Sequence, residues 1–552
     1  MPITVMAPSC TTARRHVAWF VRAVRSHAGW GHQIGHMTAL ALPVPRLPAA
    51  RASVLPAWTI GASVAASVAA RLPFLGHAAS PDEGGFLVVG AQWHGAGGSL
   101  YGRYWVDRPP LLVTIFRAAS ALGGLTALRL IGCVAVALVV LGVARVAGMI
   151  GGRVAAQWAA VTAAGLSISP LLGGYEVNGE LLAAPFVLGG VICVLAALRA
   201  VHRHEAVARS AAAGALAMSA MLIKQNLADA AVFGFVALVL AVWRGELNRQ
   251  RFWAMAAGAV AGASAVISVL AVWTIAQGTS LVGVFDAMYP FRIHAAAVQA
   301  AEGSAHSSAR LHGLLIAVTV SGLGLLLLGL VHHVVTRHRR DTSFLALVAM
   351  TLFAGTSVLL GGNYWYHYLV ELTGPLSIAA GVLVSRHGFA ARKIVAYVLV
   401  AGSVAWGVSL TRPQGTDARS VGQAIAASSM PHDTIVNAWG NADLTFASGL
   451  PSPYAQLWSL PVKTIDPQLT QLDGVLRGSA PPTWFVIRKH LYSWGLNTAR
   501  TGLILDHDYH RVTRLCGHTI FLRNGVDRPT PRIVGDCRGA TTPLVTMKEL
   551  LP

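Results

Sequence analysis

Charged residues are scarce in this 552-residue sequence: they make up 12% of the chain, against about 25% in soluble globular proteins. Hydrophobic residues make up 54%. Apolar stretches recur along most of the chain at lengths near the ~20 residues that cross the hydrocarbon core of a bilayer. The scarcity of charge excludes an ordinary soluble protein and predicts a polytopic membrane protein.

Acidic residues are also few, since 22 Asp and Glu face 42 Lys and Arg, for a formal net charge of +20. The arginines stand in short clusters between apolar stretches and do not gather in one soluble segment. Such clusters mark cytoplasmic loops and are attracted to anionic lipids. We therefore interpret the positive charge as membrane topology and binding to membrane lipids, and we predict no nucleic-acid partner.

Cysteine is the third scarce residue, with five in the chain and no pair at the spacing of a metal site. Cys133 and Cys193 fall inside apolar stretches, where free cysteines are usually inert. Cys516 and Cys537 share the C-terminal region and could form a disulfide if that region lies outside the cell.

The apolar runs predict about eleven membrane spans, with the N-terminus in the cytoplasm. The spans are 56–76, 126–148, 154–173, 181–200, 208–223, 227–243, 253–276, 311–334, 343–361, 367–385 and 392–410. A polar, Arg-rich cytoplasmic lead over residues 1–55 precedes them and has no apolar core suited to a signal peptide. The short apolar stretch 111–122 contains Arg117 and is expected to lie at the membrane interface as a helix.

Every inner loop of this topology is basic, and an odd number of spans places residues 411–552 outside the cell. The inner clusters are Arg145 with Arg153, Arg199 to Arg209, Arg244 to Arg251, Arg337 to Arg340, and Arg386 to Lys393. The β-like runs 433–439, 484–488 and 519–523 predict a small α/β domain within 411–552. We therefore expect an all-α helix bundle over 56–410, followed by a small extracytoplasmic α/β domain.

The first predicted outer loop, residues 77–125, is the most informative segment. Arg71-Leu72-Pro73 precedes it, and Asp82-Glu83-Gly84, Tyr101 and Asp107-Arg108-Pro109-Pro110-Leu111 follow in that order. Charges in a constrained loop at a membrane boundary are candidates for function. An isolated Asp-Glu pair is more often a solvated loop charge, but the following Asp-Arg-Pro-Pro makes us favour a site.

This order of motifs resembles the first external loop of the GT-C glycosyltransferases. The resemblance is greatest to the protein mannosyltransferase and aminoarabinose transferase group, of the family 39/83 type, in which Asp-Glu is followed by Lys-Pro-Pro-Leu. The present chain has Arg108 in place of that lysine, which keeps the positive charge but replaces a point charge by a planar fork. The resemblance implies a GT-C-like helix bundle.

The resemblance also implies an activity, namely inverting transfer of a sugar from a polyprenyl-phosphate donor to a hydroxyl group of a glycan, lipid or protein acceptor on the outer face. Asp82 would be the catalytic carboxylate, with Glu83 as its partner, and either could hold a divalent cation such as Mg²⁺ or Mn²⁺. Arg108, with Arg71, would bind the donor phosphate, because a nearby cation stabilises a leaving phosphate. Tyr101 and Asp107 would contact substrate.

Further candidates lie in other predicted outer loops. Glu176 and Glu180 could bind the acceptor or a cation, although solvated loop charges are an equal alternative. Lys224 is the only lysine before Lys393 and could bind the donor phosphate, or it could simply extend to the interface. His367 and Tyr368 stand in an aromatic segment that would contact the sugar or form an interfacial belt.

The sequence leaves some alternatives open. It contains neither a Walker loop nor a Rossmann glycine fingerprint, which fits a lipid-linked donor. A transporter or flippase of lipid-linked sugars would instead place charges at mid-membrane in matched halves, and an inactive scaffold is a third reading. Many alanines, glycines and arginines with few lysines are typical of a GC-rich bacterial genome, so we expect a bacterial plasma-membrane protein.

Overall fold

The computed structural model describes residues 54–94, 97–301, 304–336, 341–411, 415–488, 490–533 and 537. The predicted cytoplasmic lead lies outside these residues except for its last two positions, and Arg337 to Arg340 lie outside them as well.

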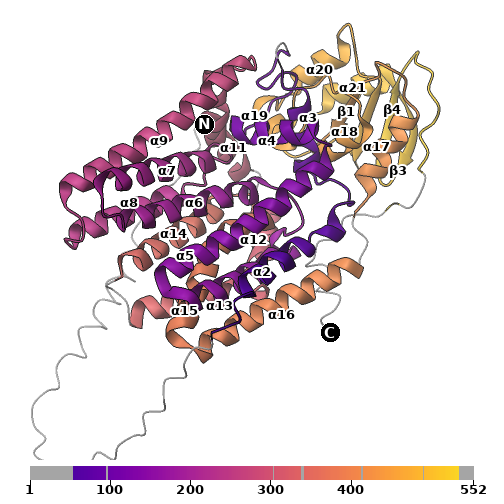
Figure 1. The fold of residues 1–552 in the computed structure, drawn as a ribbon. Helices are drawn as coiled ribbons and strands as arrows, with labels where there is room; N and C mark the ends of the chain where they lie inside the picture. The colour runs from indigo at the N-terminus through magenta and orange to yellow at the C-terminus, as the bar shows by residue number, and fades with distance from the viewer. Residues whose placement is uncertain are drawn as a thin grey trace, which may run out of the picture. The chain divides into compact units, whose positions relative to one another are not determined.

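Helices dominate the chain up to residue 411 (Figure 1). They are α2 (Thr59–Ala69), α3 (Pro81–Ala91), α4 (Pro110–Ala121), α5 (Leu125–Ser167), α6 (Gly179–Leu198), α7 (Arg203–Met221), α8 (Asp229–Trp243), α9 (Arg249–Ala276), α10 (Leu281–Met288), α11 (Pro290–Ala301), α12 (Ser304–Val320), α13 (Leu323–Thr336), α14 (Thr342–Leu360), α15 (Val370–His387) and α16 (Phe389–Thr411). Three short 3₁₀ turns join some of them, η1 (Leu72–Phe74), η2 (Pro170–Leu172) and η3 (Tyr366–Leu369). A helix therefore lies at every predicted span, and the helix predicted for 111–122 is α4.

The number of membrane-crossing helices differs from the predicted number for a physical reason. Among the described residues, six helices are long and apolar enough to cross a membrane, or up to seven if the bent pair α12 and α13 is one span. This number takes the 43-residue α5 as one helix, but a kink at Gly152, where φ is 78°, divides it into two helical segments that match the predicted spans 126–148 and 154–173. A Cβ atom on Gly148 would lie 3.3 Å from the Ala156 Cβ, so the two segments pack against each other beside the kink. The segments 59–74 and 229–243 are apolar but shorter than a full crossing. The chain is thus a multi-pass membrane protein.

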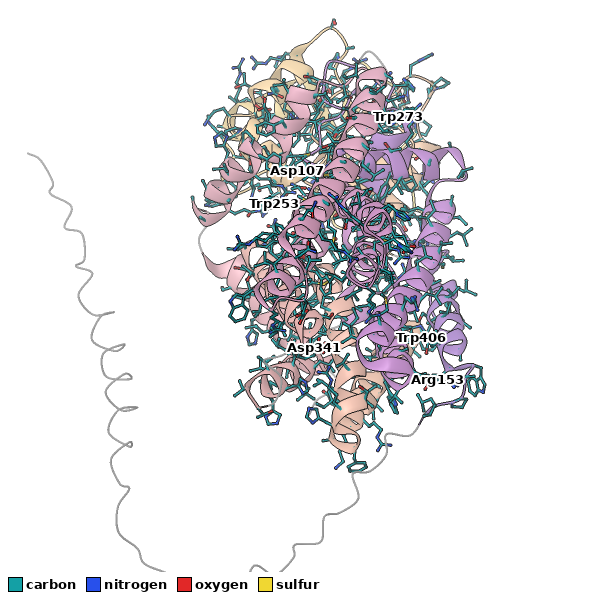
Figure 2. The ribbon with its side chains drawn as sticks, turned by 60° about the vertical axis from the view of Figure 1, so that its left-hand side comes forward. Asp107, Arg153, Trp253, Trp273, Asp341 and Trp406 are labelled. Carbon is teal, nitrogen blue, oxygen red and sulfur yellow. A yellow bond between two sulfur atoms is a disulfide. The ribbon has the colours of Figure 1, made fainter. Side chains whose placement is uncertain are left out.

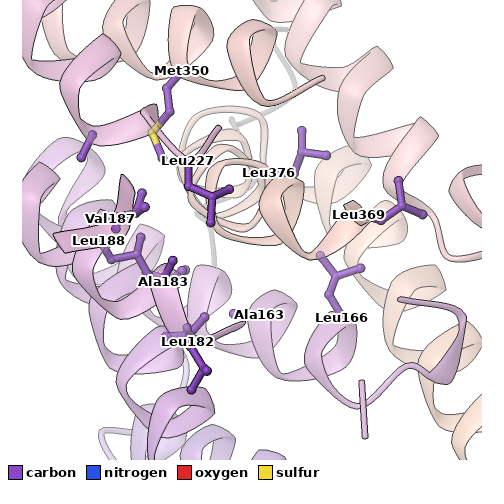
Figure 3. Packing of buried hydrophobic residues seen from close by; sticks show 14 of the residues in the cluster. Ala163, Leu166, Leu182, Ala183, Val187, Leu188, Leu227, Met350, Leu369 and Leu376 are labelled. Carbon is purple, nitrogen blue, oxygen red and sulfur yellow. The ribbon is translucent and has the colours of Figure 1, made fainter. Parts of the chain in front are cut away.

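Small residues let the central helices approach closely, as is common in membrane bundles. A Cβ atom on Gly381 would lie 2.2 Å from the carbonyl oxygen of Ala155, and one on Gly402 would lie 2.4 Å from that of Gly165. Larger apolar side chains such as Leu182 and Leu376 fill the space around them (Figure 3). This packing brings α5, α6, α15 and α16 together.

The C-terminal α/β region, residues 415–533, contains a four-stranded mixed sheet with strand order β1-β2-β4-β3. Its elements are α17 (Asp417–Ala427), β1 (Ile435–Ala438), α18 (Ala442–Ser448), α19 (Ser459–Ile465), α20 (Thr470–Arg477), β2 (Trp484–Arg488), α21 (Ala499–Asp508), β3 (Tyr509–Leu515) and β4 (His518–Arg523). The expected disulfide joins Cys516 to Cys537. The predicted small α/β fold at the C-terminus is confirmed, and β1, β2 and β4 match the three predicted runs.

Candidate active site

Asp82 lies in the first turn of α3, where the chain enters the helix through a capping box. The Ser80 side chain accepts a hydrogen bond from the backbone N–H of Glu83, and Pro81 occupies the first helical position. The Asp82 carboxylate is half-buried, and its Oδ1 accepts a hydrogen bond of 3.1 Å from the indole Nε1 of Trp458. One carboxylate oxygen of Asp82 is thus held by the C-terminal α/β region.

Glu83 is fully buried and is saturated with hydrogen-bond donors. Its carboxylate forms a two-point ion pair with Arg129, at 3.2 and 2.8 Å, and also accepts from the backbone N–H groups of Ser80 and Val177, both at 3.1 Å. These donors leave no oxygen free for a cation, so Glu83 does not fit a metal ligand. Its observed contacts tie α3 to α5 and to the loop before α6.

Arg129 is a partner that sequence reasoning missed. Its guanidinium is buried and also donates to the backbone carbonyl oxygens of Phe74, Leu75, His77 and Ala78 at 2.8 to 3.1 Å. An arginine at the outer end of a predicted apolar span, away from the basic inner cluster, is the signal that could have found it, because such a charge needs a partner.

Asp107 lies between two arginines. One of its oxygens is 2.8 Å from Arg108 Nη1, and the other is 2.8 Å from Arg292 Nη2. The buried Tyr101 hydroxyl donates to the Arg108 carbonyl oxygen at 2.7 Å, which fixes the backbone at this point. Burial by itself lowers the pKa of Arg108, but the carboxylates of Asp107 and Asp82 outweigh burial and hold that pKa above its usual range.

Lys224 and Glu180 form the second charged pair of the site. The Lys224 Nζ contacts the Glu180 carboxylate and lies 4.4 Å from the centre of the Tyr368 ring. His367 Nε2 is 4.0 Å from the same carboxylate. Glu180 stands in the first turn of α6, which Asn178 caps through its side chain, so the helix end itself favours a negative charge there.

The charged group around Asp107 and the pair of Lys224 with Glu180 belong to one cluster. The charges of Asp82 and Glu180 both act on Arg108, and both also act on His367. The structure therefore brings together residues that are far apart in the sequence. They are Asp82, Asp107, Arg108, Glu180, Lys224, His367 and Tyr368 from the predicted set, with Arg292 added from α11.

Arg71 and Glu176 lie at the side of this cluster. The buried Arg71 guanidinium donates to the carbonyl oxygens of Gly174 and Glu176, the latter at 3.0 Å, and so braces the loop before α6. Burial, and then the charges of Glu83 and Asp82, raises the pKa of the Glu176 carboxyl to about 8. Glu176 is therefore largely uncharged at neutral pH.

Arg292 is the second residue that the sequence did not single out. It lies in a predicted outer loop with other polar residues, and nothing in its immediate sequence distinguishes it. Its role depends on α11 packing over the first outer loop, where the rings of Phe291 and Trp105 meet with centres 4.5 Å apart. Only this tertiary contact places the arginine beside Asp107.

Solved structures share this arrangement of helices. The chain is similar to ArnT from Cupriavidus metallidurans bound to undecaprenyl phosphate, with 13% identity, a TM-score of 0.57, and coverage of 84% of this chain and 97% of that one. It is also similar to the oligosaccharyltransferase AglB from Archaeoglobus fulgidus in complex with an inhibitory peptide and a dolichol-phosphate, with 12% identity, a TM-score of 0.52, and coverage of 85% and 74%. A complex of the Archaeoglobus fulgidus oligosaccharyltransferase with Zn and sulfate matches with 12% identity, a TM-score of 0.52, and coverage of 78% and 68%.

No protein-family model and no curated protein matches the chain. At identities this low, the likeness to ArnT and AglB establishes the fold. The chain has a GT-C-like helix-bundle fold, the fold class that the resemblance of its first outer loop implied.

Proposed function

We propose that the protein is a membrane glycosyltransferase that moves a sugar from a polyprenyl-phosphate donor to a hydroxyl group of a glycan, lipid or protein. The observation that carries this proposal is that the half-buried Asp82 carboxylate lies within electrostatic range of Arg108 and Arg292, two cations that share the carboxylate of Asp107. ArnT, which was solved with undecaprenyl phosphate bound, has a similar fold. A base beside an anion-binding cluster is what this transfer requires.

The donor phosphate would bind among Arg108, Arg292 and Lys224. In the cluster Arg108 and Arg292 share the carboxylate of Asp107, Lys224 pairs with Glu180, and the buried Nε of Arg292 has no hydrogen-bond partner among the described residues. An arginine binds phosphate through two parallel hydrogen bonds, and it stabilises the charge that grows on the phosphate as it leaves. Arg71 is committed to backbone carbonyl oxygens and would support this region from behind.

Asp82 would act as the general base. The acceptor hydroxyl attacks the anomeric carbon of the sugar, and the bond from that carbon to the phosphate oxygen breaks. The hydroxyl proton passes to the oxygen of Asp82 that Trp458 leaves free, and polyprenyl phosphate departs. Attack from the side opposite the phosphate inverts the anomeric centre, which matches a single carboxylate acting as base.

The remaining predicted site residues divide by their contacts. His367 and Tyr368 are half-buried beside Lys224 and would contact the sugar, while the largely neutral Glu176 could donate a hydrogen bond to the acceptor. Tyr101 is fully buried and would hold Arg108 in place without touching substrate. Since Glu83 is saturated with donors, a divalent cation would have only Asp82 from the predicted pair, and no step here depends on one.

The site would face the outside of a bacterial plasma membrane. Asp107 lies toward one end of the molecule and Arg153 and Asp341 toward the other (Figure 2). Arg153 belongs to a basic cluster that the positive-inside rule assigns to the cytoplasm, which puts Asp107 outside. The disulfide between Cys516 and Cys537 supports an oxidising, extracytoplasmic location for the C-terminal α/β region.

The test of the proposed function is the substitution Asp82→Asn. We expect it to abolish sugar transfer while expression and membrane insertion stay normal, because the amide cannot accept the acceptor proton. Transfer is measured with membranes and labelled polyprenyl-phosphate sugars. The matched control is Asp286→Asn, an exposed carboxylate in α10, which should keep full activity.

Near-normal transfer by Asp82→Asn would discard the assignment of the base. Movement of labelled lipid across vesicle membranes by the wild-type protein, with no sugar transfer in any membrane preparation, would favour the transporter alternative.

A further inference from the structure

Trp458 connects the C-terminal α/β region to the proposed base. It directly precedes α19, and its indole Nε1 donates to Asp82 Oδ1 at 3.1 Å across 376 positions of sequence. Figure 1 shows α3 beside α18 and α19, so this hydrogen bond lies within a broader contact between α3 and the C-terminal region.

The Trp458 ring packs directly against Gly85 of α3. A Cβ atom on Gly85 would lie 2.3 Å from Trp458 Cζ2 and 2.8 Å from the Ala442 Cβ, so no larger residue fits at that position. The ring of Phe86 covers the indole on another side, with ring centres 5.1 Å apart. The indole is therefore held by packing as well as by its hydrogen bond.

The segment that leads to Trp458 is tied to the first outer loop. The Tyr104 hydroxyl accepts a hydrogen bond of 2.9 Å from the backbone N–H of Ser452, and the Trp105 backbone N–H donates to the Ala455 carbonyl oxygen at 3.0 Å. Both tyrosine and serine are buried. These two hydrogen bonds hold the segment that leads to Trp458 against the first outer loop.

We propose that Trp458 is a positioning residue for Asp82, so that the C-terminal α/β region completes the active site. A carboxylate in the first turn of a helix can rotate about its side-chain bonds, and a base must be held at the reacting proton to act well. The indole N–H holds Oδ1 and thereby aims Oδ2 toward the acceptor hydroxyl. This inference rests on the proposed function.

The test compares Trp458→Phe with Trp484→Phe. The first keeps an aromatic ring and removes the N–H that reaches Asp82. The second removes an indole hydrogen bond of similar length, 2.8 Å to Ser429 Oγ, inside the sheet and away from the site. We expect Trp458→Phe to lower kcat about tenfold at an unchanged KM for the donor, the rate equivalent of one hydrogen bond to a charged group. Trp484→Phe should lower the unfolding temperature and leave kcat unchanged.

A thermal double-mutant cycle of Trp458→Phe with Asp82→Ala tests the contact without depending on activity. We expect the two substitutions to be coupled in the unfolding temperature, because each removes the same hydrogen bond. Absence of coupling would overturn the inference even in a protein that transfers no sugar.

The kinetic outcomes separate the two proposals. If Asp82→Asn is inactive while Trp458→Phe has the wild-type kcat, only the positioning role is overturned. Equal loss of kcat in Trp458→Phe and Trp484→Phe would reduce Trp458 to a structural residue and would also overturn it. Activity retained by Asp82→Asn would instead remove the proposed base.

Discussion

Arg108 and Arg292 share the carboxylate of Asp107, which holds the two guanidinium groups close to each other. Arg108 donates from Nη1 to Asp107 Oδ1 at 2.8 Å and to the Asp107 carbonyl oxygen at 3.1 Å, and Arg292 donates from Nη2 to Asp107 Oδ2 at 2.8 Å. Each guanidinium therefore has further N–H donors for a ligand. Carboxylate and phosphate suit the same planar fork, and an arginine that is already oriented loses less freedom when phosphate arrives. Asp107 thus prepares two cations for one anion.

We expect Arg108→Ala to raise the KM for the donor by tenfold or more and to leave the KM for the acceptor nearly unchanged. The lost fork is a charge-assisted contact to the phosphate alone, and such hydrogen bonds contribute about 1.5–3 kcal/mol. Steady-state kinetics with each substrate varied in turn measures both constants. The control is Arg103→Ala, an exposed arginine in the same loop. Equal effects on donor and acceptor would argue against a phosphate role.

The sequence predicted Asp82 and Arg108 as candidates because they belong to one local order of motifs. It could not separate Asp82 from the adjacent Glu83, since what distinguishes them is a partner 46 positions away, Arg129 on α5. It also missed Arg292, whose place depends on how α11 packs over the first loop. The local order of residues identifies candidates for catalysis. Contacts with residues distant in the sequence determine which of the two adjacent carboxylates, Asp82 or Glu83, is already saturated with hydrogen-bond donors.

At the scale of elements, the ion pair of Glu83 with Arg129 locks the start of α3 onto α5. Both side chains are almost fully buried, and the pair carries the capping box of α3 at one end and four backbone carbonyl oxygens at the other. The position of the Asp82 carboxylate depends on this ion pair, because Asp82 lies in the first turn of the helix that the pair anchors.

Glu83→Gln is therefore expected to destabilise the fold by about 3–5 kcal/mol, since it leaves the buried Arg129 charge without its counter-charge. The matched control is Glu205→Gln, which removes a largely exposed ion pair with Arg209 and should cost less than about 1 kcal/mol. Unfolding of the purified protein in detergent compares the two. Similar stabilities of both variants would mean that the buried pair does not lock α3.

The elements themselves were predictable where their pattern is strong. The long apolar runs became helices, and the alternating or buried runs in the C-terminal region became β1, β2 and β4. Strand β3 was missed because it lies at the sheet edge, where Tyr509–Leu515 is mostly exposed and lacks a clear buried face. The predicted spans 126–148 and 154–173 correspond to the two helical segments of α5, which a kink at Gly152 separates.

At the scale of the whole molecule, the side of the membrane decides the function. Under the proposed function, the base Asp82 and the Trp458 indole act together on a donor at the outer face, which requires the first loop and the C-terminal α/β region both to lie outside the cell. The contact between Trp458 and Asp82 requires both to be on one side. An experiment that locates the C-terminal region on one side of the membrane therefore also locates Asp82.

Thiol labelling in intact cells answers this question. In the double variant Cys10→Ser, Cys516→Ser the disulfide is lost and Cys537 becomes a free thiol, while Cys133 and Cys193 stay within apolar helices. We expect a membrane-impermeant maleimide to label Cys537 in intact cells if the C-terminal region faces outward, as proposed. The control is Arg153→Cys in a background without Cys10 and the disulfide cysteines, which should react only after the cells are permeabilised. Labelling of Cys537 only in permeabilised cells would place the C-terminal region in the cytoplasm. Because Trp458 of that region contacts Asp82, Asp82 would then lie on the cytoplasmic side as well. This result would contradict a donor site on the outer face.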